Sequence, residues 1–226
     1  MKKFVLAFGF WLCLLSVAFC ELSVSDEEWN FAYNKCVGDK EADMCRLLIH
    51  NSSYFITPIE ECDRDTCLII GGTYKTAGYE SQAIEYLKRA IDLGQPEAYA
   101  LLADLYRDKN DFVKAKQNYE KCIKKCAYKI SKVNSYFWLG AMYEGGKYAK
   151  QDTQKAIQLY KMACNLVNLD AIFQIAVACY RLGEIYANGI NIEANIDFAK
   201  EYYGKSCELG FTQGCDDYNL IEKGVQ

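Results

Sequence analysis

The chain has 226 residues, twelve cysteines, one histidine and a formal net charge of −4. A mildly acidic chain without basic runs argues against a nucleic-acid partner, because such partners are bound through concentrated positive charge. The chain has two prolines, abundant Ala, Leu and Tyr, and no alternating apolar pattern of the kind that strands show, and this combination predicts an all-α protein.

Residues 1–20 have the organisation of a secretory signal peptide. Lys2 and Lys3 precede an uncharged apolar stretch at 4–19, which is short for a membrane span of about 20 residues. Cleavage after Cys20 predicts a chain that is exported to a bacterial periplasm or secreted and has no membrane contact after cleavage. A retained N-terminal anchor is the alternative.

Cleavage at that point leaves ten cysteines, an even number that in an exported chain favours a disulfide framework. They are Cys36, Cys45, Cys62, Cys67, Cys122, Cys126, Cys164, Cys179, Cys207 and Cys215. The alternative is that they are small buried hydrophobic residues. The mature chain is long enough to bury a sizeable core, so disulfides would supplement that core.

Residues 21–62 are expected to form N-terminal capping helices. One of them is predicted to start at 57–60, where Thr-Pro-Ile-Glu matches a capping box with proline at the first helical position. Cys62 and Cys67 are candidates for a bridge across four residues, because short loops are favoured entropically. This pairing is one connectivity among many.

Residues 63–222 contain an internal repeat. Four segments have a large apolar residue, then Gly or Ala, then Tyr three positions later: 70–74, 102–106, 139–143 and 182–186. A second apolar stripe follows each segment and includes Ala83, Ala115, Ala156 and Ala199, respectively. Stripes of this kind indicate paired helices, and the small residue allows close antiparallel packing. The sequence predicts about four helix pairs and a terminal cap.

Spacing distinguishes the first two pairs from the last two. The small residue precedes the alanine by 12 positions in the first two pairs and by 16 in the last two. The first two resemble tetratricopeptide repeats. The last two resemble Sel-one-like repeats, whose LGxxYxxG motif is present at Leu182, Gly183, Tyr186 and Gly189. The resemblance implies a right-handed α-solenoid of antiparallel helix hairpins stapled by disulfides.

The cysteine spacing resembles that of the Helicobacter cysteine-rich proteins, which are exported Sel-one-like repeat proteins. Cys207 and Cys215 lie eight residues apart, the spacing by which that group joins the end of one repeat to the start of the next. The resemblance implies the same staple for Cys164 and Cys179. Their spacing of 15 exceeds the family spacing of eight by seven residues, which is almost two helical turns. Both helices are therefore expected to lengthen, with 171–187 as one long helix.

Cys122 and Cys126 depart from the family spacing. Cys122 is one residue out of register, and Cys126 follows only four residues later. A bridge between them is predicted, but it requires the preceding helix to unwind near its end. The pairing of these two cysteines stays open at this point.

Catalytic motifs are scarce. His50 has no HExxH context, and the chain lacks SxxK, GxSxG and phosphate-loop patterns, so no metal or cofactor is expected. Proteins of the resembling cysteine-rich group are described as penicillin-binding or β-lactamase-like, which makes a hydrolase of that type the alternative function. The stretch 75–77, Lys-Thr-Ala, is the closest approach to a KTG element. Without a CxxC motif, the cysteines are expected to be structural.

The favoured function is a scaffold that binds a partner through its concave face, which the first helix of each repeat would line. The tetratricopeptide resemblance places nine residues there: Lys75, Asp104, Arg107, Asn134, Phe137, Glu144, Tyr180, Glu184 and Asn188. Polar and aromatic side chains suit an extended segment. The expected partner is a protein, a peptide or a peptidoglycan-like fragment, bound by a monomer. The alternative is an ordinary solvated face.

Overall fold

The computed structural model describes Cys36, Cys45, Ile49 and residues 58–146, 150–166 and 171–224. Within these ranges all regular structure is helical, which confirms the predicted all-α solenoid. None of the helices described is long and apolar enough to cross a membrane. The expected signal peptide and most of the expected N-terminal capping segment lie outside the described residues.

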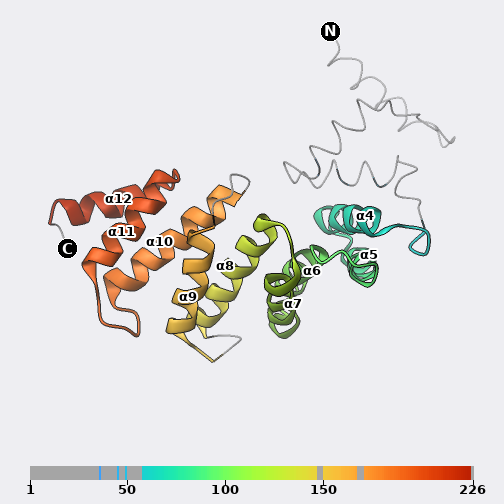
Figure 1. Ribbon diagram of the computed structural model, residues 1–226, viewed down its shortest axis with the longest axis horizontal. Coiled ribbons are helices and arrows are strands. Elements are labelled where there is room, and N and C mark those ends of the chain that lie inside the picture. The colour runs from blue at the N-terminus through green and yellow to red at the C-terminus, as the bar shows by residue number, and fades with distance from the viewer. Residues whose placement is uncertain are drawn as a thin grey trace, which may run out of the picture.

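Successive helices form antiparallel hairpins in an elongated array (Figure 1). The first helices of the four pairs are α4 (Arg64–Ala77), α6 (Ala98–Asp108), α8 (Lys129–Gly145) and α10 (Ile172–Asn188). The second helices are α5 (Glu80–Asp92), α7 (Phe112–Lys125), α9 (Thr153–Cys164) and α11 (Ile196–Glu208), and α12 (Thr212–Glu222) packs against α11.

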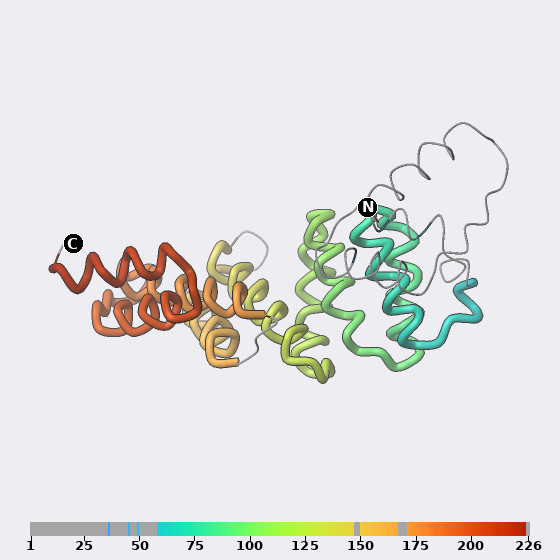
Figure 2. The backbone as a smooth tube through the Cα atoms, turned by 90° about the horizontal axis from the view of Figure 1, so that it is seen from above, coloured from blue at the N-terminus to red at the C-terminus, as the bar shows by residue number. Residues whose placement is uncertain are grey.

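The first helices pack against one another from pair to pair: α4 against α6, α6 against α8, and α8 against α10. No two second helices pack to a comparable extent within the described ranges. We call the face lined by α4, α6, α8 and α10 the inner face. The halves α4–α7 and α8–α12 follow one another along the long axis (Figure 2), and the array twists between α7 and α8.

Each hairpin closes where a large side chain of the second helix packs on a small residue of the first. A Cβ atom added to Gly140 would lie 2.8 Å from Cε1 of Tyr160, and one added to Gly183 would overlap the ring of Tyr203. Both rings therefore lie directly against the backbone of the first helix. This close approach explains why these positions carry glycine.

One backbone hydrogen bond is common to all four hairpins. The N–H of the residue that precedes the second helix donates to the carbonyl of the motif tyrosine, at 2.8–3.0 Å: Tyr79 to Tyr74, Asp111 to Tyr106, Asp152 to Tyr143, and Asn195 to Tyr186. The donor follows the tyrosine by five positions in the first two pairs and by nine in the last two. The additional loop residues of the last two pairs are therefore accommodated before this bond, which accounts for the 12- and 16-residue spacings.

The expected helix start at 57–60 is wrong for the residues described. Residues 59–61 form a turn, and α4 begins only after Asp63. The Asp63 carboxylate accepts hydrogen bonds from the backbone N–H groups of Asp65 and Thr66. Aspartate at this position satisfies two N–H groups of the first turn, so the helix starts here.

The expected long helix at 171–187 is confirmed as α10, but the expectation that both helices around Cys164 and Cys179 lengthen is wrong. α9 ends at Cys164, where the Asn165 N–H closes the last turn, and only α10 is extended. The additional turns of α10 bury Ile175 and Ala176, which explains why the extra residues extend this helix.

The structure pairs ten cysteines as sequence neighbours: Cys36–Cys45, Cys62–Cys67, Cys122–Cys126, Cys164–Cys179 and Cys207–Cys215. Their Cα atoms are 4.5–5.4 Å apart, within the usual range for a disulfide. α7 ends at Lys125 and Cys126 has an extended backbone, so the unwinding that this bridge requires is present. Gly210, with φ of +85°, turns the chain back toward Cys215.

Candidate functional site

The nine residues predicted for binding all lie on the first helices: Lys75 on α4, Asp104 and Arg107 on α6, Asn134, Phe137 and Glu144 on α8, and Tyr180, Glu184 and Asn188 on α10. They do not form one uniform row. The structure gathers them into a polar cluster around Asp104, a second polar cluster around Glu144, and an aromatic group around Tyr180.

Asp104 is the centre of the first polar cluster. Its Oδ1 accepts hydrogen bonds from Tyr119 Oη at 2.5 Å, Arg107 Nη1 at 3.1 Å and Asn134 Nδ2 at 3.2 Å. Lys75 Nζ lies 3.9 Å from Oδ2. These partners come from α4, α6, α7 and α8, so one carboxylate connects three successive repeats.

The Arg107 guanidinium is fixed from two further directions. Its Cζ lies 3.8 Å from the centroid of the Trp138 ring, and Nη2 donates to Asp108 at 2.8 Å. Burial alone lowers the pKa of Arg107, but Tyr119, Asp104 and Asp108 raise it, and the net pKa lies above the ordinary value. Arg107 therefore stays charged. Trp138 was not among the residues predicted for this face, although it follows Asn134 by one helical turn.

Glu144 is the centre of the second polar cluster. Its Oε2 accepts a hydrogen bond from Tyr160 Oη at 2.7 Å, and its Oε1 pairs with Arg181 Nη2. Arg181 also donates through Nη1 to Glu184 at 2.6 Å. Burial alone lowers the pKa of Arg181, but the two glutamates raise it above the ordinary value. The cluster joins α8 to α10 and holds Arg181 in its charged form.

Tyr119 and Tyr160 bring hydroxyl groups from second helices to the inner face. Both rings are buried, and burial raises the pKa of both, as does the neighbouring carboxylate. The two phenols therefore stay protonated and donate to Asp104 and Glu144. Both tyrosines follow a stripe alanine, Ala115 or Ala156, by four positions and so belong to the apolar stripes of the second helices. The available signal in the sequence was the choice of Tyr over Phe, because a buried hydroxyl needs a partner. Asp104 and Glu144 are thus satisfied internally.

Tyr180 belongs to an aromatic group at the C-terminal end of the inner face. Its ring centroid lies 5.1 Å from Phe211 and 5.5 Å from Tyr203, and the rings of Phe173 and Phe211 are 6.2 Å apart. Burial raises the pKa of Tyr180 to about 12, with a contribution from Glu184. Phe173 is 66% exposed, so this group presents apolar surface to solvent. Neither phenylalanine was among the residues predicted from the sequence.

The other two predicted residues differ in their surroundings. Phe137 packs at 5.9 Å from the Tyr160 ring and 5.1 Å from Trp138, so it supports the two polar clusters from within. Asn188 is exposed, and its Nδ2 donates to the Glu184 carbonyl at 3.0 Å. Of the two, Asn188 is the one available to a partner.

Catalytic chemistry finds no support on this face. Lys75 pairs with Asp104, and Thr76 Oγ1 donates to the Gly72 carbonyl at 3.1 Å, so both residues of the KTG-like stretch have partners inside the solenoid. Among the described residues, no group of three or more His, Cys, Asp or Glu side chains is arranged to hold a metal ion. His50 lies outside the described residues.

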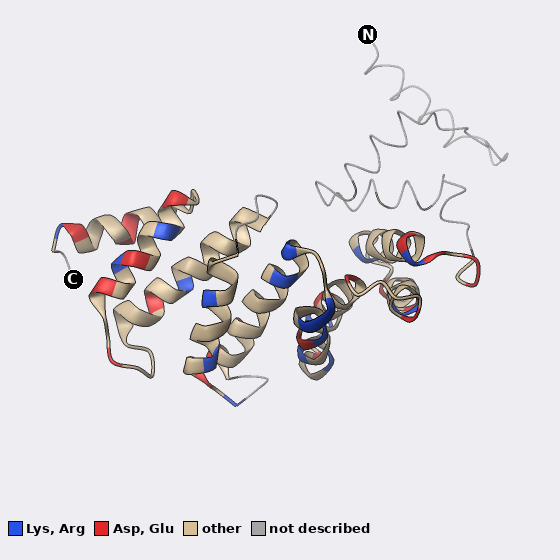
Figure 3. Cartoon of the chain, in the orientation of Figure 1, with Lys and Arg blue, Asp and Glu red and all other residues tan. Residues whose placement is uncertain are grey.

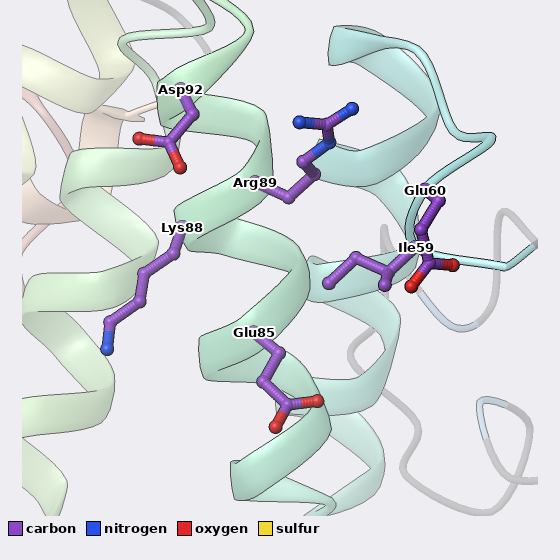
Figure 4. Close-up of a pocket in the computed structure, with 6 residues that line it drawn as sticks. All are labelled: Ile59, Glu60, Glu85, Lys88, Arg89 and Asp92. Atoms are coloured by element: carbon purple, nitrogen blue, oxygen red, sulfur yellow. The ribbon is translucent and has the colours of Figure 1, made fainter.

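A shallow pocket of about 380 Å³ lies away from the inner face, beside α5 (Figure 4). Side chains of both charges surround it together with one isoleucine: Ile59, Glu60, Glu85, Lys88, Arg89 and Asp92. None of the nine predicted residues lines it, and its charges are mixed. The inner face therefore remains the candidate site.

Two family models match the chain over consecutive segments. The tetratricopeptide repeat model matches residues 65–93 and 96–124, and the Sel1 repeat model matches residues 133–168 and 176–211. No curated protein sequence matches the chain.

Solved structures show the same fold. A Sel1 repeat protein from Oxalobacter formigenes is 18% identical with a TM-score of 0.60, over 82% of this chain and 78% of that one. A protective antigen of uropathogenic Escherichia coli strains, which displays an SLR fold, is 18% identical with a TM-score of 0.60, over 86% of this chain. The chain spans 44% of that antigen's length. With two repeats of each kind in succession, the chain belongs to the Sel1-like and tetratricopeptide repeat proteins.

Proposed function

We propose that the chain is an exported scaffold that binds an extended peptide segment of a partner protein on its inner face. Repeats of these two kinds commonly mediate protein–protein interaction. The five neighbour disulfides support an oxidising compartment, because such bonds persist outside the cytosol.

One observation carries the proposal: Arg107 and Arg181 are each fixed by a carboxylate while part of the side chain stays accessible. Their side chains are 20% and 39% exposed. Fixing a side chain before binding reduces the entropy lost when the partner arrives. Two oriented guanidinium groups on one face are therefore suited to recognition.

The chemistry of the partner follows from which groups remain available. Asp104 and Glu144 are satisfied internally, so the accessible groups are the arginine edges and the aromatic group with Phe173. Guanidinium groups bind carboxylates and backbone carbonyls, and exposed aromatic rings bind apolar side chains. An extended peptide with an acidic residue and an apolar anchor fits this combination. A peptidoglycan-like fragment shares the carboxylates but lacks a large apolar anchor.

Cross-linking and pull-down from a native envelope fraction test the proposal. The inner-face variant is Phe173→Asp with Asn188→Arg, and the matched control on α7 is Val113→Asp with Gln117→Arg. Phe173 and Val113 are 66% and 64% exposed, and Asn188 and Gln117 are both exposed, so the two pairs introduce the same two residues at exposed positions.

Wild type and control should recover a partner that the inner-face variant loses. Equal recovery by all three proteins would contradict binding on the inner face. A soluble muropeptide mixture is added as competitor; displacement of the partner would assign the site to a cell-wall fragment instead of a protein segment.

A further inference from the structure

A lysine-rich surface lies at the junction of α7 and α8. Five lysines fall within twelve residues: Lys121, Lys124, Lys125, Lys129 and Lys132. Residues 121–143 contain no Asp, Glu or Arg. Figure 3 shows these positive charges on α7 and the first turns of α8. We call the five lysines with Tyr128 and Ile130 the basic junction.

None of the five lysines of the basic junction has a carboxylate partner in the described ranges, whereas about half of the lysines elsewhere in the solenoid have one. Six lysines in other places each lie within 4.0 Å of a carboxylate: Lys75, Lys109, Lys114, Lys116, Lys200 and Lys205. No carboxylate in the described ranges lies that close to a lysine of the basic junction. Lys121 and Lys125 instead lie 5.5 and 5.6 Å from the Tyr99 ring centroid. None of these five positive charges is therefore neutralised by an ion pair within the described ranges.

Two large side chains project among these lysines. Tyr128 is 61% exposed and Ile130 is 43% exposed. The loop that carries Tyr128 is held in place, because the buried Glu97 carboxylate accepts hydrogen bonds from the N–H groups of Ala127 and Tyr128 at 2.8 and 3.1 Å. The Cys122–Cys126 disulfide fixes the chain on the other side. In the basic junction, Tyr128 and Ile130 therefore project from a fixed backbone and are surrounded by lysines.

We propose that the basic junction docks on an anionic membrane surface. The lysines would face the lipid phosphates with their stems on the protein, and Tyr128 and Ile130 would enter the headgroup layer. Tyrosine is enriched at membrane–water interfaces. This inference replaces the expectation from sequence that the mature chain makes no membrane contact. It is independent of the inner face, whose predicted residues it does not use.

The composition of the surface favours lipid over an acidic protein partner. Protein–protein interfaces are depleted in lysine and enriched in arginine. The basic junction contains lysine only, whereas the inner face contains Arg107 and Arg181. Lysine is a strongly hydrated point charge, suited to diffuse attraction by a charged surface.

Co-sedimentation of the oxidised protein with lipid vesicles tests the proposal. Vesicles of phosphatidylglycerol and phosphatidylcholine are compared with pure phosphatidylcholine at low and high salt. The test variant replaces Lys121, Lys124, Lys125 and Lys129 by Gln. A control of identical net charge replaces Lys88, Lys155, Lys205 and Lys223 by Gln, and circular dichroism checks that both are folded.

Wild type and control should bind the anionic vesicles and not the neutral ones, with weaker binding at high salt. The test variant should lose affinity by about fivefold for each lysine removed. Tyr128→Ser, which leaves the charge unchanged, should also weaken binding.

Three outcomes would overturn the proposal. These are no binding of wild type to anionic vesicles, equal loss in the test variant and the control, and unchanged binding by Tyr128→Ser. Polyglutamate serves as a second probe. If wild type binds polyglutamate through these lysines and ignores vesicles, the basic junction is a site for an acidic protein segment and the membrane proposal is wrong.

Discussion

The two halves of the solenoid fasten their repeats in different ways. In the half with tetratricopeptide spacing, α4–α7, buried polar side chains cross the junctions. Gln95, in the α5–α6 turn, donates to Asp65 on α4, and Glu97 accepts the N–H groups of Ala127 and Tyr128 from the following junction. Two bridges reach this half: Cys62–Cys67 ties the turn before α4 to α4, and Cys122–Cys126 ties the last turn of α7 to the residue that follows it, so neither joins two helices.

In the Sel1-like half, α8–α12, covalent bonds cross the junctions in addition to the Glu144–Arg181 ion pair between α8 and α10. Cys164–Cys179 joins α9 to α10, and Cys207–Cys215 joins α11 to α12. Both halves nevertheless close their hairpins with the same backbone hydrogen bond to the motif tyrosine. Hairpin closure is therefore the same in both halves, whereas disulfides between helices are added only in the Sel1-like half of the described residues.

Removing the bridge that crosses a junction should have the largest effect. Cys164→Ala with Cys179→Ala opens a loop with a sequence separation of 15, and its removal should lower the free energy of unfolding by about 3 kcal/mol. The matched variant Cys122→Ala with Cys126→Ala opens a separation of only 4 and should cost about 2 kcal/mol. Urea unfolding of both oxidised variants measures the difference. A larger loss from removing the α7 bridge would contradict the conclusion that the disulfide between α9 and α10 stabilises the solenoid more.

Hairpin closure is tested by adding one methyl group. Gly183→Ala places a Cβ atom into the ring of Tyr203 and should lower the free energy of unfolding by about 2 kcal/mol through overpacking. Gly72→Ala is the matched control, because its Cβ would meet nothing nearer than Leu101 Cδ1 at 3.6 Å. That substitution should be neutral or stabilising by up to about 1 kcal/mol, owing to the higher helix propensity of alanine. Equal urea midpoints for the two variants would show that the close approach of the Tyr203 ring does not require glycine at position 183.

The helix hairpins were predictable because the residues that define each hairpin lie close together in the sequence. The small residue, the tyrosine three positions later and the following alanine stripe fix each hairpin within about thirty residues, and the inner-face residues follow from their place on the first helix. The start of α4 was predicted incorrectly, since two capping signals compete within six positions and Asp63 caps two N–H groups.

The contacts of the inner face were not predictable, because they join residues of different repeats. Arg107 meets Trp138, and Glu144 meets Arg181. In both pairs the first residue lies four positions after the small residue of its repeat, and the second lies two positions before the small residue of the next repeat. Whether these equivalent positions come into contact depends on how one hairpin is displaced and rotated relative to the next. The sequence pattern within a hairpin does not contain that information. As a result, Arg107 and Glu144, which were predicted as binding residues, also form contacts between repeats.

The polar fastening of the first half is tested at Glu97. Glu97→Ala leaves two backbone N–H groups without their acceptor and should lower the free energy of unfolding by about 2 kcal/mol. Glu97→Gln keeps one acceptor oxygen and should cost about half as much. Hydrogen exchange at Ala127 and Tyr128 should accelerate in the alanine variant. Unchanged exchange at both amides would mean that the junction does not depend on this carboxylate.

The smallest expected effect is a difference between the two halves in how the helix cap before the second helix responds to pH. Asp111 and Asn195 occupy equivalent positions before α7 and α11, where their side chains accept the N–H of Lys114 and Phe198 at 3.2 and 2.9 Å. The Lys114 side chain and backbone N–H lower the pKa of Asp111 below 3.8. Because the folded pKa is depressed, the contribution of this cap is complete above pH 3.8 and is lost as the pH falls through the lowered value. The carboxamide of Asn195 does not titrate. Hydrogen-exchange protection at Lys114 should therefore fall in acid while protection at Phe198 does not, and Asp111→Asn should remove the difference; a parallel fall at both amides would mean that general acid unfolding, and not the cap, controls them.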